Sequence, residues 1–194
     1  MGISEQSDEI IRRTIQESIQ VKEAIVRNMI PEIAQAAAWI VASYGNGGKL
    51  VLFGNGGSAG DAQHIAAELV GRFERERRAL PAIALTTNTS TLTAIGNDYG
   101  YNKIFSRQVE AWVQPADVVI GISTSGNSPN VLEGIAAAKL KGAKTIGLTG
   151  EKGGKLASQT DLCLKVPSSN TARIQESHIM IGHLLCLLLE QQIT

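Results

Sequence analysis

The sequence predicts an α/β fold, in which a doubly wound, mainly parallel five-stranded sheet follows an N-terminal helical hairpin. Two observations lead to this prediction. From residue 50 onward, short apolar segments alternate with segments of helical periodicity, as in parallel sheets covered by helices on both faces. Before residue 50 there are two helical segments and no strand signal. The 194 residues suit one domain (1–194), with the hairpin in 1–48 and the α/β part in 49–194.

The two N-terminal helices are expected over Ser7–Met29 and from Pro31 to about Tyr44. Apolar residues recur at helical spacing in the first helix. Pro31 fits the first turn of the second helix, and a glycine-rich segment ends that helix at Gly45. A long amphipathic helix at a chain end is expected to pack on a partner subunit, with packing on its own sheet as the alternative.

Strands and helices then alternate, and the glycine-punctuated segment Thr93–Asn102 is expected to be a loop. The expected strands are Leu50–Phe53, Ala82–Thr86, Val118–Ser123, Thr145–Thr149 and Leu162–Val166. The expected helices are Ala59–Phe73, Lys103–Val113, Asn130–Lys141 and Arg173–Gln191.

Composition argues against nucleic-acid and membrane partners. The formal net charge is zero, with basic residues dispersed along the chain, whereas nucleic-acid binding needs a basic face. The polar, acidic start MGISEQSDEI is unlike a signal peptide, and the longest apolar run, Ile179–Leu189, is shorter than the roughly 20 residues that span a bilayer. Cys163 and Cys186 lie in apolar segments outside any C-x-x-C motif, which indicates buried thiols. We therefore expect a cytoplasmic protein.

The first glycine-rich turn matches a dinucleotide-binding pattern, but its context does not fit. Gly54, Gly56 and Ala59 satisfy G-x-G-x-x-G/A after an apolar strand. A nicotinamide site also needs an acidic residue at the end of the next strand, and the nearest candidates, Glu74 and Glu76, precede that strand. No G-K-[ST] follows, which excludes a Walker loop. The pattern alone therefore does not predict a nicotinamide site.

The segment STSGNSPN (123–130) is a stronger candidate for phosphate binding. Four hydroxyls surround a glycine turn where a strand ends and a helix begins: Ser123, Thr124, Ser125 and Ser128. Hydroxyls, backbone N–H groups and a helix N-terminus together form a phosphate-binding site. The alternative is a serine-rich loop that only caps the helix. A third polar turn, TGEKGG (149–154), also follows a strand.

The helices carry two further groups of polar residues. His64 and Glu68 are four residues apart on one helix face, and can be metal ligands, a base with its orienting partner, or a solvated ion pair. His183 lies in apolar sequence, where a histidine is usually a hydrogen-bonded core residue. On a helical wheel Glu176 aligns with His183 better than Gln175 does.

Four other polar residues have weaker assignments. His178 is expected at the surface or beside a site. Asn97 and Asp98 either form a turn or hydrogen-bond sugar hydroxyls, and Arg72 either contacts a phosphate or carboxylate or belongs to a solvated segment.

Five collinear motifs resemble those of the bacterial phosphoheptose isomerases, which are sugar-isomerase (SIS) domain enzymes. The resemblance covers Leu50–Glu190, and the N-terminal hairpin fits it as well. The motifs are GNGGSAGDAQHIAAELVGRF, GNDYGYNKIFSRQVEA, GISTSGNSPNV, LTGEKGGKLA and ARIQESHIMIGHLL.

This resemblance implies the interconversion of sedoheptulose 7-phosphate and D-glycero-D-manno-heptose 7-phosphate, the entry step to ADP-heptose and the lipopolysaccharide core. It also implies a cytoplasmic homotetramer with shared active sites and one zinc ion per subunit. The implied zinc ligands are His64, Glu68, Gln175 and His183, so the resemblance favours Gln175 over Glu176. The implied substrate contacts are Asn55, Gly56, Gly57, Glu68, Arg72, Asn97, Asp98, Ser123, Thr124, Ser125, Ser128 and Gln175.

Aldose–ketose isomerisation moves a proton between adjacent carbons through an enediol(ate), which requires a base at carbon and an acid/base at the oxygens. Glu68 is the candidate for the carbon and His183 for the oxygens or ring opening. The chain also resembles a non-catalytic SIS branch that binds the bacterial replication initiator as a tetramer. That branch lacks the catalytic glutamate and histidine, so Glu68 and His183 favour the enzyme. Ala172 departs from isomerases that carry an acidic residue there, which puts one substrate contact in doubt.

Overall fold

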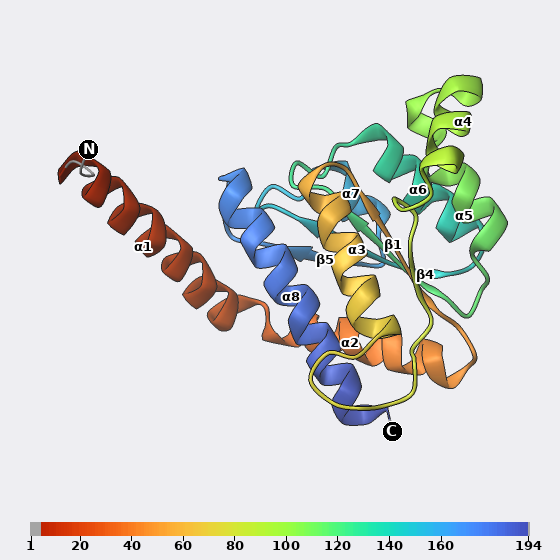
Figure 1. Ribbon diagram of the computed structural model, residues 1–194, viewed down its shortest axis with the longest axis horizontal. Helices are drawn as coiled ribbons and strands as arrows, with labels where there is room; N and C mark the ends of the chain where they lie inside the picture. Colours follow the sequence, from red (N-terminus) through yellow and green to blue (C-terminus); the bar gives the residue numbers. More distant parts are fainter. Residues whose placement is uncertain (1–4, 194) are drawn as a thin grey trace.

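The computed structural model describes residues 5–193, so the first four residues of the polar start and Thr194 lie outside the described residues. A five-stranded sheet with the order β2-β1-β3-β4-β5 is parallel throughout (Figure 1). The strands are β1 (Leu50–Gly54), β2 (Ala82–Ala84), β3 (Val118–Ile122), β4 (Lys144–Thr149) and β5 (Leu162–Lys165). The α-helices are α1 (Glu5–Asn28), α2 (Ile30–Gly45), α3 (Gly57–Val70), α4 (Thr89–Tyr99), α5 (Ser106–Trp112), α6 (Pro129–Leu140), α7 (Gly154–Gln159) and α8 (Thr171–Gln192), with a 3₁₀ turn η1 (Tyr101–Lys103).

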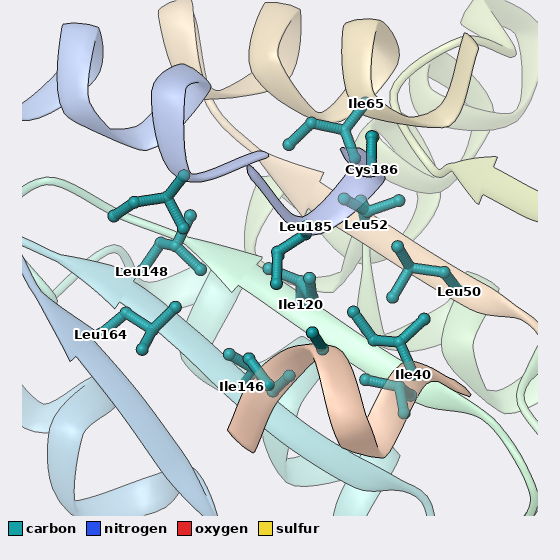
Figure 2. Packing of buried hydrophobic residues seen from close by; sticks show 14 of the residues in the cluster. Ile40, Leu50, Leu52, Ile65, Ile120, Ile146, Leu148, Leu164, Leu185 and Cys186 are labelled. Carbon is teal, nitrogen blue, oxygen red and sulfur yellow. The ribbon is translucent and has the colours of Figure 1, made fainter. Parts of the chain in front are cut away.

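Both faces of the sheet are buried, as the apolar strands predicted. In β1, Leu50 and Leu52 pack into the core formed with α2, α3 and α8, whereas Val51 and Phe53 pack into the core formed with α5 and α6. Figure 2 shows the first core, where Ile65 of α3 lies over the strands. Burying one such side chain contributes about 1.5–3 kcal/mol, so both faces hold the sheet between the helices. The predicted doubly wound fold is confirmed.

The N-terminal helices form as expected, with Met29 between α1 and α2, consistent with a helical hairpin. In Figure 1, α1 extends away from the rest of the molecule. Its outward side chains include large apolar ones, such as Ile11 and Ile15, which are 48% and 56% exposed. Within residues 5–193, no helix has both the length and the apolar character needed to cross a membrane.

Two local predictions differ from the structure. The segment Thr93–Asn102, expected to be a loop, lies mostly in α4, because the Asn88 side chain caps that helix by accepting the Thr91 N–H and Gly100 ends it at φ +85°. The short helix α7 was not expected. The first prediction failed because side-chain capping outweighed a glycine signal. The helix α7 begins at Gly153 and Gly154, two glycines with positive φ that are typical of a turn.

Candidate functional site

The strand order reverses direction between β1 and β3, which is where ligands bind in doubly wound sheets. The loops after these two strands are joined by a pair of side-chain amides. Asn55 Nδ2 donates to Asn130 Oδ1 at 2.9 Å, and Asn130 Nδ2 donates to Asn55 Oδ1 at 2.8 Å. Tyr101 Oη also donates to Asn55 Oδ1, at 3.2 Å. The sequence interpretation missed Asn130 and Tyr101, because no pattern along the chain relates them to Asn55.

The glycine turn after β1 brings the chain close to α8. Gly56 adopts φ +56°, a conformation that favours glycine. A Cβ on Gly57 would lie 2.5 Å from Gln175 Nε2, so Gln175 contacts this turn directly. The backbone of this turn therefore lies close to the Gln175 side chain. Gly56 and Gly57 stay exposed beside it.

The seryl loop 123–128 forms its own hydroxyl cluster after β3. Ser123 Oγ is buried and lies 2.9 Å from Ser128 Oγ and 3.4 Å from Ser125 Oγ. Ser128 is the N-cap residue of α6, but its side chain makes no capping hydrogen bond. Ser128 therefore does not cap α6 through its hydroxyl, and phosphate binding by this loop stays a prediction.

The seryl loop also forms one wall of a cavity of about 300 Å³. A Cβ on Gly126 would lie 2.0 Å from Gly153 O, so the loop packs directly on the turn after β4. That turn contributes Lys152, a cation, to the same cavity as Thr124 and Ser125. The remaining lining residues are Asn127, Gly150, Glu151, Ser168, Ser169, Thr171 and Ile174. The cavity thus combines several hydroxyls with one cation, Lys152, and one carboxylate, Glu151.

A cluster of two histidines and a carboxylate lies between α3 and α8. His64 Nε2 is 3.0 Å from Glu68 Oε1 and 3.4 Å from His183 Nε2. One donor atom from each of the three side chains lies within 4.8 Å of the others. The interpretation of His183 as a hydrogen-bonded core residue is therefore wrong, because it faces His64 and is only half-buried.

The cluster fits a metal ion by its chemistry. Two imidazole nitrogens that face each other at 3.4 Å repel one another unless a proton or a cation lies between their lone pairs. Nitrogen and carboxylate donors are the ligands that Zn²⁺ uses in catalytic sites. His64, Glu68 and His183 can therefore hold a divalent metal ion.

Two residues of α8, Glu176 and His178, lie elsewhere than the sequence indicated. Glu176 accepts hydrogen bonds from Ser18 of α1 and from Arg173, so the preference for Glu176 over Gln175 is wrong. His178 is fully buried rather than at the surface, with Nε2 3.2 Å from Thr149 O. Burial lowers the pKa of His178 to about 4, although the hydrogen bond to Thr149 opposes this shift.

Asp61 was missed by the sequence interpretation. It lies three residues before His64 on α3, and its Oδ2 is buried without a hydrogen-bond partner among residues 5–193. Burial raises the pKa of Asp61 to about 6, with His64 opposing the shift. Its spacing could have indicated it, because residues three apart on a helix are neighbours, which puts Asp61 beside His64.

Three expected substrate contacts form hydrogen bonds or ion pairs away from the cluster within residues 5–193. Arg72 is exposed and forms a long ion pair with Glu76 at 3.9 Å. Asn97 and Asp98 are exposed on α4, where Asn97 Nδ2 donates to Asp98 Oδ1 at 2.9 Å. The assignments of these residues stay predictions.

A family model for the SIS domain matches residues 15–150. The phosphoheptose isomerase of Rhodospirillum rubrum is 61% identical over 160 residues, which are 82% of this chain and 85% of that protein.

The chain belongs to the SIS-domain family, among the phosphoheptose isomerases. Two solved phosphoheptose isomerases share the fold. The one from Neisseria gonorrhoeae is 45% identical with a TM-score of 0.90, and the one from Francisella tularensis is 43% identical with a TM-score of 0.92. Each alignment covers 95% of this chain and 98% of the other. The resemblance found in the five motifs is thus confirmed over the whole phosphoheptose isomerase fold.

Proposed function

We propose that this SIS-domain protein is an aldose–ketose isomerase that converts sedoheptulose 7-phosphate into D-glycero-D-manno-heptose 7-phosphate, the first step toward ADP-heptose and the lipopolysaccharide core. This proposal rests on the cluster of His64, Glu68 and His183, in a fold that also presents the seryl loop at the carboxyl end of the central strand β3. The names of relatives with more than half of their residues identical support the same reaction.

Glu68 and His183 are the proposed catalytic residues. The Glu68 carboxylate moves the proton between the two substrate carbons, and His183 exchanges protons with the oxygens during ring opening and enediol(ate) formation. A carboxylate has two oxygen atoms, so contact of Oε1 with the cluster leaves the second oxygen for proton transfer. Glu68 lies on α3 and His183 on α8, and one donor atom of each lies within 4.8 Å of the other, so both can act on neighbouring atoms of one bound sugar.

Zinc is the proposed metal, held by His64, Glu68, Gln175 and His183, with one ion per subunit. When bound, it supplies Lewis-acid polarisation of the substrate carbonyl or diolate. Gln175 shares α8 with His183 and contacts Gly57 at the start of α3, so it faces the helix that carries His64 and Glu68; its inclusion among the ligands follows the family resemblance.

Phosphate binding is assigned to Ser123, Thr124, Ser125 and Ser128, at a distance from the reacting carbons. Binding energy gained at such a remote group can be used to orient the sugar at the reacting end. Asn55, Gly56 and Gly57 are assigned to the sugar. Arg72, Asn97 and Asp98 are proposed as further substrate contacts.

The proposed assembly is a cytoplasmic homotetramer with shared active sites. Its support is the apolar face of α1, where Ile10, Ile11, Ile15 and Ile19 are all more than 40% exposed. An apolar stripe of this size on a projecting helix is typical of a subunit interface.

The decisive experiment incubates the purified protein with sedoheptulose 7-phosphate and zinc and follows aldose formation. We expect turnover by the native sequence and its loss in Glu68→Gln and His183→Gln. No turnover by the native sequence with zinc supplied would overturn the proposed reaction. Full activity in Glu68→Gln would overturn only the assignment of the base. Capture of the replication initiator by an inactive protein would instead support the non-catalytic alternative.

A further inference from the structure

The segment between α3 and β2, residues 71–81, contains no helix or strand, yet a buried ion pair holds it. The side chains of Arg77 and Glu190 are 4% and 0% exposed, and Arg77 Nε lies 3.2 Å from Glu190 Oε1. Two charges are taken out of water at a high cost unless their other hydrogen-bonding groups are satisfied. The other hydrogen-bond partners of Arg77 and of Glu190 therefore show which parts of the chain this ion pair holds in place.

Glu190, on the last turns of α8, binds the backbone of this segment. Its carboxylate accepts the N–H groups of Phe73, Glu74 and Arg75 at 2.8, 2.9 and 2.9 Å. Burial raises the pKa of the Glu190 carboxyl, but these three donors and Arg77 outweigh burial and hold the pKa below its usual range. The group therefore stays a carboxylate that fixes three consecutive residues of the segment.

Arg77 binds the end of α3 at the same time. Its guanidinium donates to the carbonyls of Glu68 and Leu69, both at 2.8 Å, and to that of Gly71 at 2.9 Å. The Glu68 and Leu69 carbonyls belong to the last turn of the helix that carries His64 and Glu68, and Gly71 is the residue that ends it. A cation is favourable at such a helix end. One ion pair thus joins the end of α3, segment 71–81 and the end of α8. The helices α3 and α8 lie side by side in Figure 1.

Phe73 connects this ion pair to the candidate site. Its ring stacks on the His183 imidazole, with centroids 5.2 Å apart and an interplanar angle of 28°. Its backbone N–H is held by Glu190, which follows His183 by seven residues, about two turns of α8. We infer that Arg77 and Glu190 are positioning residues for His183, which act by seating the Phe73 ring against its imidazole; this inference rests on the proposed function.

His183 needs a positioning contact because its imidazole can rotate about the second side-chain torsion. The second side-chain torsion of histidine is broad, so α8 alone does not fix the ring plane of His183. A stacked Phe73 restricts that torsion and keeps Nε2 directed toward His64 at 3.4 Å. Groups that orient a ligand or catalytic side chain in this way typically change metal affinity or activity about 10–100-fold when they are removed.

The test compares Phe73→Leu, which removes the stacked ring but keeps an apolar side chain, with Phe73→Tyr, which keeps the ring. We expect Phe73→Leu to lower kcat and zinc affinity about tenfold with little change in KM, and Phe73→Tyr to retain both. Zinc affinity is measured by competition with a chromophoric chelator, so it does not depend on turnover. Glu74→Gln, an exposed change in the same segment, is the matched control and should retain native values.

Glu190→Gln tests the ion pair itself. It should lower kcat and zinc affinity in the same direction, and the double variant with Phe73→Leu should lose no more than the larger single loss, because both changes act through one contact. Native kcat and zinc affinity in folded Phe73→Leu would overturn the inference, as would additive losses in the double variant. A lower melting temperature without either loss would show a purely structural role. If Glu190→Gln does not fold, the Phe73 variants decide the matter. An inactive native protein would count against the proposed reaction, while the zinc measurements would still test this inference.

Discussion

Gly182 of α8 lies directly against Ile65 of α3, so closely that a Cβ on Gly182 would be 2.5 Å from Ile65 Cδ1. This contact sets the separation of the two helices that carry His183 and His64. The neighbouring residue His183 therefore reaches His64 because residue 182 has no side chain.

Replacing Gly182 with alanine should push α8 away from α3. We expect a loss of about 1–3 kcal/mol in the free energy of unfolding, as for other overpacked cores, and weaker zinc binding. Urea denaturation and chelator competition measure the two effects. Gly60→Ala is the matched control, because a Cβ there meets nothing within 4 Å. Unchanged stability and zinc binding in Gly182→Ala would show that the helices adjust without cost.

The amide pair of Asn55 and Asn130 offers a second test. In Asn130→Leu the Asn55 side chain loses both of its hydrogen bonds to residue 130, and we expect a loss of about 1–3 kcal/mol in the free energy of unfolding. KM for the sugar phosphate should also rise, because the loop after β1 carries Gly56 and Gly57. Chemical denaturation and steady-state kinetics check this. A destabilised variant with the native KM would show that the amide pair stabilises the fold without contributing to substrate binding.

Removing hydroxyls from the seryl loop should weaken substrate binding more than turnover. In Ser125→Ala we expect KM to rise about tenfold, which corresponds to about 1.4 kcal/mol, with kcat changed less. Inorganic phosphate should inhibit that variant correspondingly less well. Ser158→Ala, on α7, is the control, since its exposed hydroxyl donates to Lys155 O, away from the seryl loop. A fall in kcat with native KM would argue against phosphate binding by this loop.

His178 should make stability depend on pH. Its pKa is about 4 in the folded chain against 6.5 for a free histidine, so the unfolded chain binds more protons between these values. Stability contributed by the neutral ring is therefore present above pH 6.5 and is lost as the pH falls toward 4. From about pH 7 to about pH 5, we expect the native chain to lose about 2 kcal/mol more than His178→Gln, measured by urea denaturation at each pH. Parallel pH curves for the two chains would contradict this.

The sequence alone determined the order of the five strands and of the helices other than α4 and α7, because apolar runs and helical periodicity are local and survive without tertiary context. It also identified the glycine turn, the seryl loop and the His64–Glu68 pair, since these depend on short spacings along the chain.

Only the tertiary structure decided how these pieces meet. Helical geometry alone favoured Glu176, whereas packing of α8 against α1 directs Glu176 to Ser18 and leaves Gln175 against Gly57. The approach of His183 to His64 depends on the space left by Gly182, and the stacking of Phe73 on His183 depends on Glu190, far along the chain. Contacts between distant segments are set by packing and burial, which a pattern along one element does not contain.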